Sequence, residues 1–467
     1  MSAPESAPLP EADAGEARRA DLWAAFLLAG LATAFIAFTV WPGLMSFDSL
    51  YAYRQSIEGV DTALWPPVHD YLFFIFRHLP GNPGGLLLFQ SFALFLSANL
   101  IIRHLAPSAT VSVPLMAMFF GLFVAFPTLL GALIVLWKDV TVGTFAVMAV
   151  ALWLSGTRRF SWARFLALFA CVTISIALRY NALPLVLPFM LLVVWRPAGP
   201  ASTGRQQAAA GLGIVVTLAL AYASTLWRLP DLQRLPSVAP MMTNIKLWDI
   251  AGTSVCAGQS LLTDVVTPGD PFTVEELRAL YNPRHINLTF DTPLWNERLG
   301  TRYVWRSVPA IEQRWREILV AHPGCYLATR LAVFEQQMGL NTPVTYYPTH
   351  GGIDDNPYGF TLAFPERAAR LIQMIVEGAN APWRRGYVLA GLALFFLLPA
   401  LWIDRRGAIL PLALYAGTLG FLGLLFVAAP AGDARYIFPP GVFAALVIVT
   451  SLACIARARH ARRVLAL

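Results

Sequence analysis

Charged residues are scarce in this sequence. They make up 13% of its 467 residues, whereas an average soluble domain contains about 25%. Hydrophobic residues make up 57%, and a soluble fold of this length could not bury that much apolar surface. The composition therefore indicates an all-α polytopic membrane protein, whose spans are helices rather than open strands because backbone groups in lipid need internal hydrogen bonds.

Lysine is nearly absent. Of the 34 Lys and Arg residues, only Lys138 and Lys246 are lysine, and the other 32 are arginine. The formal net charge is +7, but no basic helix and no basic patch interleaved with aromatic residues accompanies it. The charge therefore does not indicate a protein that binds nucleic acid.

Ten apolar stretches have about the 17–25 residues that a helix needs to cross the hydrocarbon core, although one of them is short. They are residues 21–41, 84–102, 110–128, 139–156, 163–179, 181–196, 208–227, 386–403, 408–430 and 436–455. The short loops and tails on one side of these helices carry 14 basic residues, and the short segments on the other side carry 7. By the positive-inside rule, we expect both termini in the cytoplasm.

The stretches between and beyond these helices divide the chain into four parts. A long polar segment separates the seventh and eighth helices, and local signals within it predict helices, such as a capping box at Thr273 and Glu276. The expected parts are a disordered cytoplasmic tail (1–20), a transmembrane region with a catalytic first outer loop at 42–83 (21–227), a large, mostly helical extracytoplasmic loop domain (228–385), and C-terminal transmembrane helices with a basic cytoplasmic tail (386–467).

Cysteine is scarce as well, with four residues. Cys171 and Cys454 lie in predicted helices, whereas Cys256 and Cys325 both lie in the loop domain, in an oxidising compartment where disulfides persist. The sequence leaves the pairing of these two open, because it does not give the distance between their Cα atoms.

Ionisable residues are almost missing from the middles of the ten helices. Proton- and ion-coupled transporters usually need such residues near mid-membrane, so their absence disfavours that class. The polar residues gather instead at the outer ends of the helices. Five junctions show this pattern: "SFDSLYAYRQ" (46–55), "LWKDVT" (136–141), "RYNALP" (179–184), "NIKLWDIAG" (244–252) and "GDARYIFPP" (432–440).

One carboxylate near several cations on this face suits a particular chemistry. Glycosidases need two carboxylates because a leaving alkoxide must be protonated, whereas a leaving phosphate needs its negative charge neutralised. We therefore expect Asp48 to deprotonate an acceptor hydroxyl. The cations that we expect to bind the departing phosphate are Lys138, Arg179 and Arg435.

The same motifs resemble those of the GT-C superfamily of integral membrane glycosyltransferases, which includes protein O-mannosyltransferases and lipid A aminoarabinose transferases. The matching features are the acid of "SFDS" just past the first helix, "WPPVHDYLF" (65–73), Lys138-Asp139, Arg179-Tyr180-Asn181 and "RYIFPP" (435–440). The resemblance implies a polyprenyl-phosphate-linked sugar donor and an inverting displacement at the anomeric carbon, with Asp48 as the base. Asp48-Ser49 stands where the superfamily commonly has an acidic pair, so we expect no metal cofactor, with a divalent cation as the alternative.

Further residues at the outer face are candidates for contacts with donor or acceptor. They are Asp139, Tyr180, Asn181, Lys246, Trp65, His69 and Tyr436. Several have a structural alternative: Asp48 could cap the helix that it begins, Asp139 could cap or pair, and Trp65 could anchor the chain at the interface. The segment 346–360 is rich in Gly, Pro, Asp and Asn and is either an ordered functional loop or a flexible lid. Its Asp354-Asp355 pair is of a kind more often solvated than bound to a cation.

These observations predict an inverting glycosyltransferase that moves a sugar from a polyprenyl-phosphate donor to an acceptor. The sequence does not determine the sugar, or whether the acceptor is a lipid, a glycan or a protein. We expect the protein in a bacterial inner membrane, among its lipids, with the active site on the periplasmic face. The alternatives are a polymerase or ligase of diphosphate-linked polysaccharides, and a flippase or transporter of lipid-linked glycans.

Overall fold

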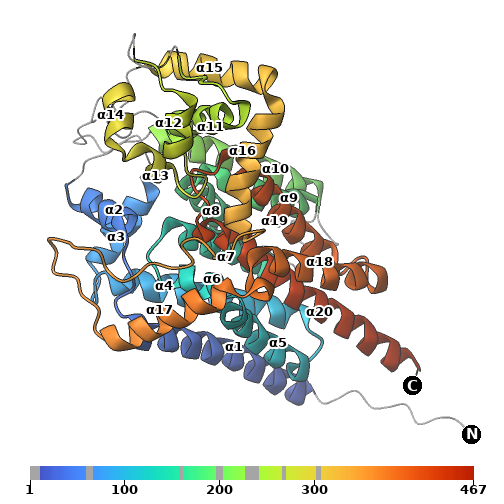
Figure 1. The fold of residues 1–467 in the computed structure, drawn as a ribbon. Coiled ribbons are helices and arrows are strands. Elements are labelled where there is room, and N and C mark those ends of the chain that lie inside the picture. The colour runs from blue at the N-terminus through green and yellow to red at the C-terminus, as the bar shows by residue number, and fades with distance from the viewer. Residues whose placement is uncertain are drawn as a thin grey trace, which may run out of the picture.

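The computed structural model describes residues 11–58, 67–156, 161–195, 203–226, 241–263, 265, 270–300 and 307–466. In this part of the chain the regular structure is helical, and β-pairing is confined to isolated bridges. Figure 1 shows a bundle of long helices with a group of shorter helices at one end. The predicted all-α fold class is therefore confirmed.

Seven helices of the described chain are long and apolar enough to cross a membrane. They are α1 (Glu11–Val40), α4 (Gly84–Leu105), α7 (Lys138–Gly156), α10 (Gly204–Leu226), α18 (Gly386–Ile403), α19 (Ile409–Ala428) and α20 (Phe438–Ala466). Two shorter apolar helices pack against them: α8 (Trp162–Leu178) against α7, and α9 (Leu183–Trp195) against α19. The chain is a multi-pass membrane protein.

The predicted span at 110–128 is not one straight helix. It is divided into α5 (Ala109–Ala125) and α6 (Pro127–Leu133), whose axes differ in direction by 91°. Pro127 accounts for the break, because proline cannot donate a backbone hydrogen bond and it restricts the conformation of the residue before it. The predicted count of ten crossings therefore requires that this bent pair, α8 and α9 each cross once.

The first helix begins at Glu11, before the predicted start of the first span at residue 21. Residues 11–20 are thus helical rather than part of the expected disordered tail. The Ala, Glu and Arg residues of this segment favour helix, and the apolar span after them supplies the costly first turns. Residues 1–10 lie outside the described part. The start of α1 and the end of α20 lie on the same side of the bundle (Figure 1), as termini in one compartment require.

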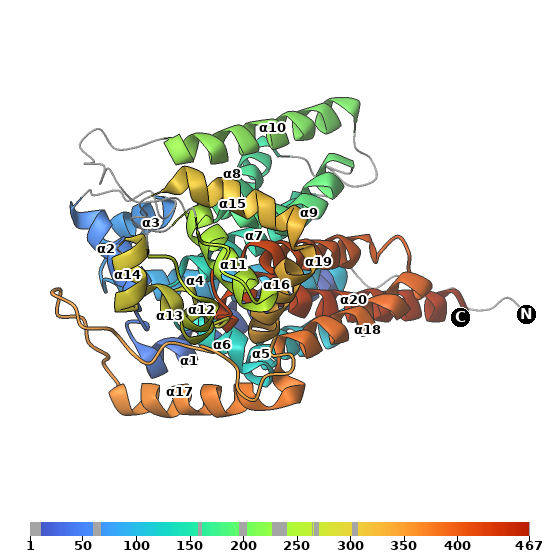
Figure 2. The same ribbon diagram turned by 45° about the horizontal axis from the view of Figure 1, so that its top comes forward.

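Six helices among the described residues form the loop domain, at the top of Figure 1. They are α11 (Met241–Ala257), α12 (Val274–Leu280), α13 (Ile286–Phe290), α14 (Pro293–Leu299), α15 (Val308–Ala321) and α16 (Pro323–Met338). The capping box predicted at Thr273 and Glu276 is present at the start of α12. A seventh helix, α17 (Pro365–Asn380), lies apart from these six, against α1 and α6 along one edge of the molecule (Figure 2).

Two helices of the loop domain are joined to each other and to the bundle. A disulfide links Cys256 at the end of α11 to Cys325 at the start of α16, with 5.5 Å between their Cα atoms. Five residues further along α16, Arg330 donates a hydrogen bond to Asp249 of α11 at 3.0 Å and another to the carbonyl of Phe426 in α19 at 2.9 Å. These contacts hold the loop domain over the end of the bundle.

Three segments meet in a small parallel ladder between the bundle and the loop domain. Residues 44–45 lie between residues 134–136 on one side and residues 352–354 on the other. Two backbone hydrogen bonds with N···O distances of 2.9 or 3.0 Å join each neighbouring pair. We call this the three-segment ladder. It brings two predicted site residues to one place, because Asp48 closely follows the first segment and Lys138 the second.

Candidate functional site

Asp48 lies in the first turn of α2 (Phe47–Glu58), directly after the three-segment ladder. Its Oδ2 accepts a hydrogen bond from Nη1 of Arg435 at 2.8 Å, although 387 residues separate the two in the sequence. The side chain of Asp48 is 30% exposed, and that of Arg435 is 10% exposed. Burial opposes ionisation of Asp48, but the charges of Arg435 and Lys138 outweigh it and hold the pKa of the carboxyl below its usual value. At neutral pH Asp48 is therefore an ionised carboxylate that a ligand can reach, and we call such a carboxylate open.

Arg435 is the centre of a group of charged residues that also contains Asp48, Asp433, Asp139, Arg179 and Lys138, which we call the charged cluster. It lies in η3 (Ala434–Ile437), the short turn that precedes α20. Besides Asp48, the guanidinium contacts Oδ2 of Asp433 at 3.0 Å and donates to the hydroxyl of Tyr436 at 3.1 Å. Its Cζ also lies 5.1 Å from the ring centre of Trp137. These contacts fix the plane of the guanidinium, and a fixed plane is what fork-like recognition of a phosphate requires.

Arg179 and Lys138 bring two more cations to this cluster. Arg179 follows α8, forms an ion pair with Asp139, and has its Cζ 4.3 Å from the ring centre of Tyr436, which Arg435 also contacts. Lys138 begins α7 and lines the same small cavity as Asp48. The structure thus brings together the four residues expected to carry the chemistry: Asp48, Lys138, Arg179 and Arg435.

The small cavity beside Asp48 lies between α2, α3 (Val68–Arg77) and the start of α7. Its volume of about 20 Å³ has room for roughly one water molecule. His69 of α3 lines it, is only 5% exposed, and has no hydrogen-bond partner for Nε2 among the described residues. Burial lowers the pKa of His69 to about 3, so its imidazole is uncharged and can bond a neutral hydroxyl.

Tyr180 and Asn181 stand next to Arg179 in the single turn η1 (Tyr180–Ala182). Tyr180 is 46% exposed. The Oδ1 atom of Asn181 is buried and accepts no hydrogen bond from the described residues. Position therefore supports the expectation that this turn contributes contacts near the cluster.

Two predicted contact residues are not part of the cluster in the described structure. Lys246 of α11 pairs with Glu312 of α15, and its Nζ lies 5.0 Å from the ring centre of Trp315. The sequence placed 244–252 at a helix mouth of the bundle, but α11 packs against α15 and α16 instead, so the charge of Lys246 is engaged inside the loop domain. Trp65 lies outside the described residues.

Asp433 is a cluster residue that the sequence analysis did not single out. It is 2% exposed and shares the guanidinium of Arg435 with Asp48. Burial raises the pKa of Asp433 to about 6, against the opposing charge of Arg435. Its position within "GDARYIFPP" was the available signal, since this junction was already noted for its charges.

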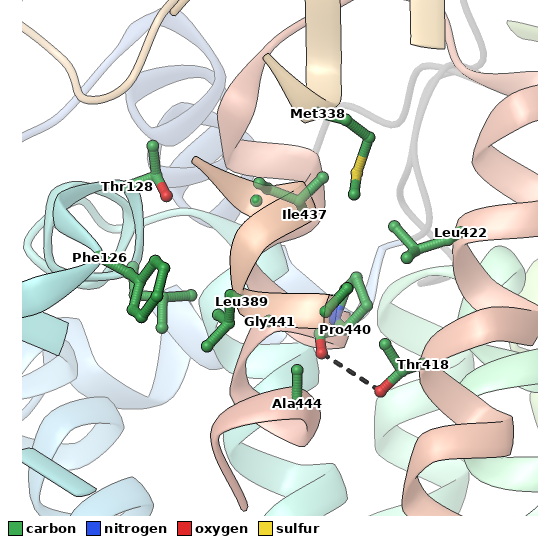
Figure 3. A pocket seen from close by; sticks show the side chains of 13 residues that line it. Phe126, Thr128, Met338, Leu389, Thr418, Leu422, Ile437, Pro440, Gly441 and Ala444 are labelled. Carbon is green, nitrogen blue, oxygen red and sulfur yellow. Dashed lines mark hydrogen bonds between the residues drawn. The ribbon is translucent and has the colours of Figure 1, made fainter. Parts of the chain in front are cut away.

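An apolar cavity lies next to the cluster, between α6, α18, α19 and α20 (Figure 3). Ile437 of η3 contributes to its wall, and the hydroxyl of Thr418 donates to the carbonyl of Pro440 at 3.3 Å across it. Its volume of about 20 Å³ again corresponds to roughly one water molecule. A lipid chain would therefore enter here only if side chains such as Met338 moved.

Metal ligands do not gather in the part of the chain that the structure describes: no group of three or more His, Cys, Asp or Glu side chains is arranged to hold an ion. The carboxylates of the cluster pair with arginine instead, Asp48 and Asp433 with Arg435, and Asp139 with Arg179. Sugar transfer measured with and without a chelator would test whether the protein needs a divalent cation.

No family model matches this chain, and no curated protein matches it either. Two solved structures are similar to it. The oligosaccharyltransferase of Archaeoglobus fulgidus, in complex with Zn and sulfate, aligns over 94% of this chain and 51% of its own, with a TM-score of 0.39 and 13% identity. ArnT of Cupriavidus metallidurans, bound to undecaprenyl phosphate, aligns over 92% of this chain and 77% of its own, with a TM-score of 0.33 and 14% identity.

Both structures resemble this chain over most of its length but only weakly, so the GT-C resemblance of the sequence motifs stays a prediction. The chain spans about half the length of the archaeal enzyme. With TM-scores below 0.5, these likenesses leave the donor, the acceptor and the mechanism to be argued from the cluster itself.

Proposed function

We propose that this chain is an inverting glycosyltransferase that takes a sugar from a polyprenyl-phosphate donor and transfers it to an acceptor hydroxyl. The contact between Asp48 and Arg435 carries the proposal: an open carboxylate lies 2.8 Å from a fixed guanidinium. Lys138 lines the cavity beside Asp48, and Arg179 shares Tyr436 with Arg435. A carboxylate that a ligand can reach on one side, and that lies among three cations, suits a reaction whose leaving group is a phosphate.

In the proposed step, the acceptor hydroxyl attacks the anomeric carbon from the face opposite the phosphate, which inverts the configuration. The new C–O bond forms while the bond to the phosphate oxygen breaks, and the electron pair of that bond goes to the phosphate. Asp48 takes the proton of the hydroxyl. Lys138, Arg179 and Arg435 neutralise the charge that develops on the leaving phosphate, which is usually the largest catalytic effect of such sites.

The ion pair with Arg435 also couples the strength of the base to the presence of the donor. Without donor, Arg435 and Lys138 hold the pKa of Asp48 low, which makes it a weak base. A phosphate that binds these cations satisfies part of their charge and weakens their hold on the carboxylate. Asp48 then becomes a stronger base only when the donor is in place, which limits wasteful hydrolysis.

Two neutral groups beside the cluster are suited to bind the sugar. Nε2 of His69 and Oδ1 of Asn181 are buried and have no hydrogen-bond partner among the described residues. An unpaired buried polar atom is costly, so a ligand that supplies its partner gains that free energy on binding. Sugar hydroxyls can donate and accept, and would satisfy both atoms.

We place the site on the periplasmic face of a bacterial inner membrane. The cluster lies at the end of the bundle that carries the loop domain, and the Cys256–Cys325 disulfide of that domain suits an oxidising compartment. The distribution of arginine supports the same orientation. At this level a polyprenyl chain would lie in the bilayer while its phosphate reached the cations.

The test is transfer by the purified full chain in liposomes, with sugar donors linked through a monophosphate or a diphosphate. We expect product only from the monophosphate, and no effect of EDTA. Asp48→Asn should lower the rate by about 10²–10⁴-fold with the fold intact, on the usual scale of acid–base catalysis. Glu58→Gln, on the exposed part of the same helix, is the matched control and should leave the rate unchanged.

Three results would contradict the proposal. Product from the diphosphate donor alone would indicate a polymerase or ligase. Movement of the lipid-linked sugar across the bilayer without a new bond would indicate a transporter. Undiminished transfer by Asp48→Asn would remove the proposed base.

A further inference from the structure

A chain of three ionisable side chains lies in the loop 346–360. The hydroxyl of Tyr347 is 2.5 Å from Nδ1 of His350, and Nε2 of His350 is 2.9 Å from Oδ1 of Asp354. A carboxylate can only accept, so His350 donates from Nε2, and Nδ1 of the neutral ring then accepts from Tyr347. The three groups are thus aligned to pass a proton from the tyrosine end to the carboxylate end.

The tyrosine end of this chain lies at the charged cluster. The ring of Tyr347 packs on that of Trp137, with 5.9 Å between centroids, and the Cζ atom of Arg435 lies 5.1 Å from the centre of the same Trp137 ring. Burial raises the pKa of Tyr347 well above its usual value, and the charges of Arg435 and Asp433 are the next strongest influences on it. The hydroxyl therefore keeps its proton at neutral pH and stands within the field of the site.

The carboxylate end of the chain reaches water. The side chain of Asp354 is 45% exposed, whereas that of His350 is 11% exposed. The backbone N–H of Asp354 donates to the carbonyl of Met45 at 3.0 Å, as part of the three-segment ladder. The ladder therefore holds this loop in a fixed position relative to the segment that leads to Asp48.

The backbone at Tyr347 points to a role for its side chain. Its φ is +50°, a left-handed conformation that costs an ordinary residue about 1–2 kcal/mol. The other non-glycine residue with positive φ in the described chain is Asn341, a type that tolerates this conformation. Glycine would adopt the same turn more easily than Tyr347, and strain of this kind gathers at functional sites.

We propose that Tyr347, His350 and Asp354 form a proton-transfer chain that returns Asp48 to its carboxylate form after each sugar transfer. The inference rests on the proposed function of Asp48 as the base. Donor and acceptor would cover the open side of Asp48 and exclude bulk water from it. The proton taken from the acceptor would then need another way out.

In this step no bond other than those to protons changes. Asp48 gives its proton to the oxygen of Tyr347, directly or through one bridging water. The original hydroxyl proton of Tyr347 moves to Nδ1 of His350, and the Nε2 proton moves to Asp354 and on to solvent. The net result is one proton moved from the reaction centre to the aqueous face.

The experiment separates the first turnover from later ones. With enzyme in excess over labelled donor, rapid quenching measures the first sugar transfer; with donor in excess, the steady rate includes the reset of Asp48. Tyr347→Phe should leave the first turnover near the normal rate and lower the steady rate by about tenfold or more. Tyr358→Phe, on the same loop, is the matched control and should change neither rate.

Chemical rescue provides a second readout that a structural role would not produce. His350→Ala should lower the steady rate, and added imidazole should restore part of it. Asp354→Asn should slow the steady rate, whereas Asp355→Asn, at the exposed neighbouring position, should not.

The proposal is overturned if Tyr347→Phe slows the first turnover as much as the steady rate, because Tyr347 then acts on the substrate. It is also overturned if the steady rate of Tyr347→Phe is normal, or if imidazole fails to rescue His350→Ala. Failure of the underlying function has a different signature, since Asp48→Asn would then keep its first turnover.

Discussion

Two aspartate–arginine pairs join distant parts of this chain, and they are built in opposite ways. Arg330 and Asp249 are sealed between the loop domain and the bundle, with 0% and 1% of their side chains exposed. Arg435 and Asp48 lie at the charged cluster, with 10% and 30% exposed. We call Arg330 and Asp249 the sealed pair, because neither solvent nor a ligand can reach it. We call Arg435 and Asp48 the open pair, because a ligand can reach one side of it.

The hydrogen-bond partners show the same contrast. Arg330 gives its remaining donors to backbone carbonyls at the end of α19, including those of Phe426 at 2.9 Å and Ala429 at 3.0 Å. Asp249 also accepts from the indole of Trp315 at 3.1 Å. Burial raises the pKa of Asp249 against the influence of Arg330, whereas the cations around Asp48 lower its pKa in spite of burial. The surroundings of Arg330 and Asp249 keep their ion pair closed, whereas those of Arg435 and Asp48 allow a ligand to replace one partner.

The two aspartate–arginine pairs therefore have different roles, one in stability and the other in catalysis. A buried ion pair contributes little net stability compared with an apolar packing of the same shape, but losing one partner is costly. The sealed pair therefore fixes where the loop domain sits. The open pair keeps a charged base and a phosphate-binding cation together until the donor separates them.

The largest effect is expected at the sealed pair. Arg330→Gln should lower the free energy of unfolding by about 3–5 kcal/mol, because it leaves Asp249 buried without its cation. Thermal unfolding in detergent measures it. Combining Asp249→Leu with Arg330→Met should recover most of the loss. Arg54→Gln, which breaks the exposed pair with Glu58, is the control and should cost less than about 1 kcal/mol. Equal losses at both positions would contradict the comparison.

A smaller loss of stability is expected at the disulfide between the same two helices. Cys256→Ser with Cys325→Ser should lower the free energy of unfolding by about 2–4 kcal/mol, since the bond closes a loop with a sequence separation of 69. Sugar transfer per folded molecule should stay normal, because the cluster is built from other segments. A variant that stayed folded but lost transfer would show that the disulfide supports the site directly.

The open pair should respond in activity rather than stability. Arg435→Gln should slow transfer by about 100-fold, the usual effect of removing one preorganised donor to a developing charge. Its unfolding temperature should change less than that of Arg330→Gln, because Asp48 is partly exposed and Asp433, whose pKa is about 6, can take up a proton when the cation is lost. The initial rate at saturating donor gives the comparison, and a collapse of stability without a specific loss of rate would make Arg435 a structural residue like Arg330.

The smallest effect concerns Asp433, the second carboxylate on Arg435. Its pKa is raised to about 6, so it gains its proton as the pH falls through that value, while Asp48 stays ionised. Arg435 then carries more unshared charge, and the KM for a phosphodiester donor should fall by about threefold between pH 7 and pH 5. Asp433→Asn should remove this dependence. The folded state should also gain stability over the same fall in pH, because it binds this proton before the unfolded chain does.

Local features of the fold could be predicted from sequence because neighbouring residues determine them. The capping box at Thr273 and Glu276 needs only four consecutive positions, and the apolar spans need only hydropathy. Pro127 is also a local signal for the bend after α5, but hydropathy does not show it, because the stretches on both sides of Pro127 are apolar. The placement of α11 could not be predicted, because Lys246 and its partner Glu312 belong to helices whose packing depends on the whole loop domain.

The site could be predicted as a face of the membrane but not as a set of contacts. Topology placed Asp48, Lys138, Arg179 and Arg435 on one side. The sequence could not show that Arg435 reaches Asp48 across 387 residues, or that Asp139 pairs with Arg179. The chain from Tyr347 to Asp354 was equally hidden, because its relation to the site depends on a three-segment ladder between segments far apart in sequence.

The most direct test of the central claim is an experimental structure of the full chain with a polyprenyl phosphate bound. We predict that the phosphate lies within about 3 Å of Lys138, Arg435 or both, with Arg179 near it and Asp48 on its aqueous side. A third and larger cavity, of about 530 Å³ and lined by residues that include Asp21, Arg103 and His104, lies at the other end of the bundle. A phosphate bound there, with the cluster around Asp48 and Arg435 unchanged, would contradict the account.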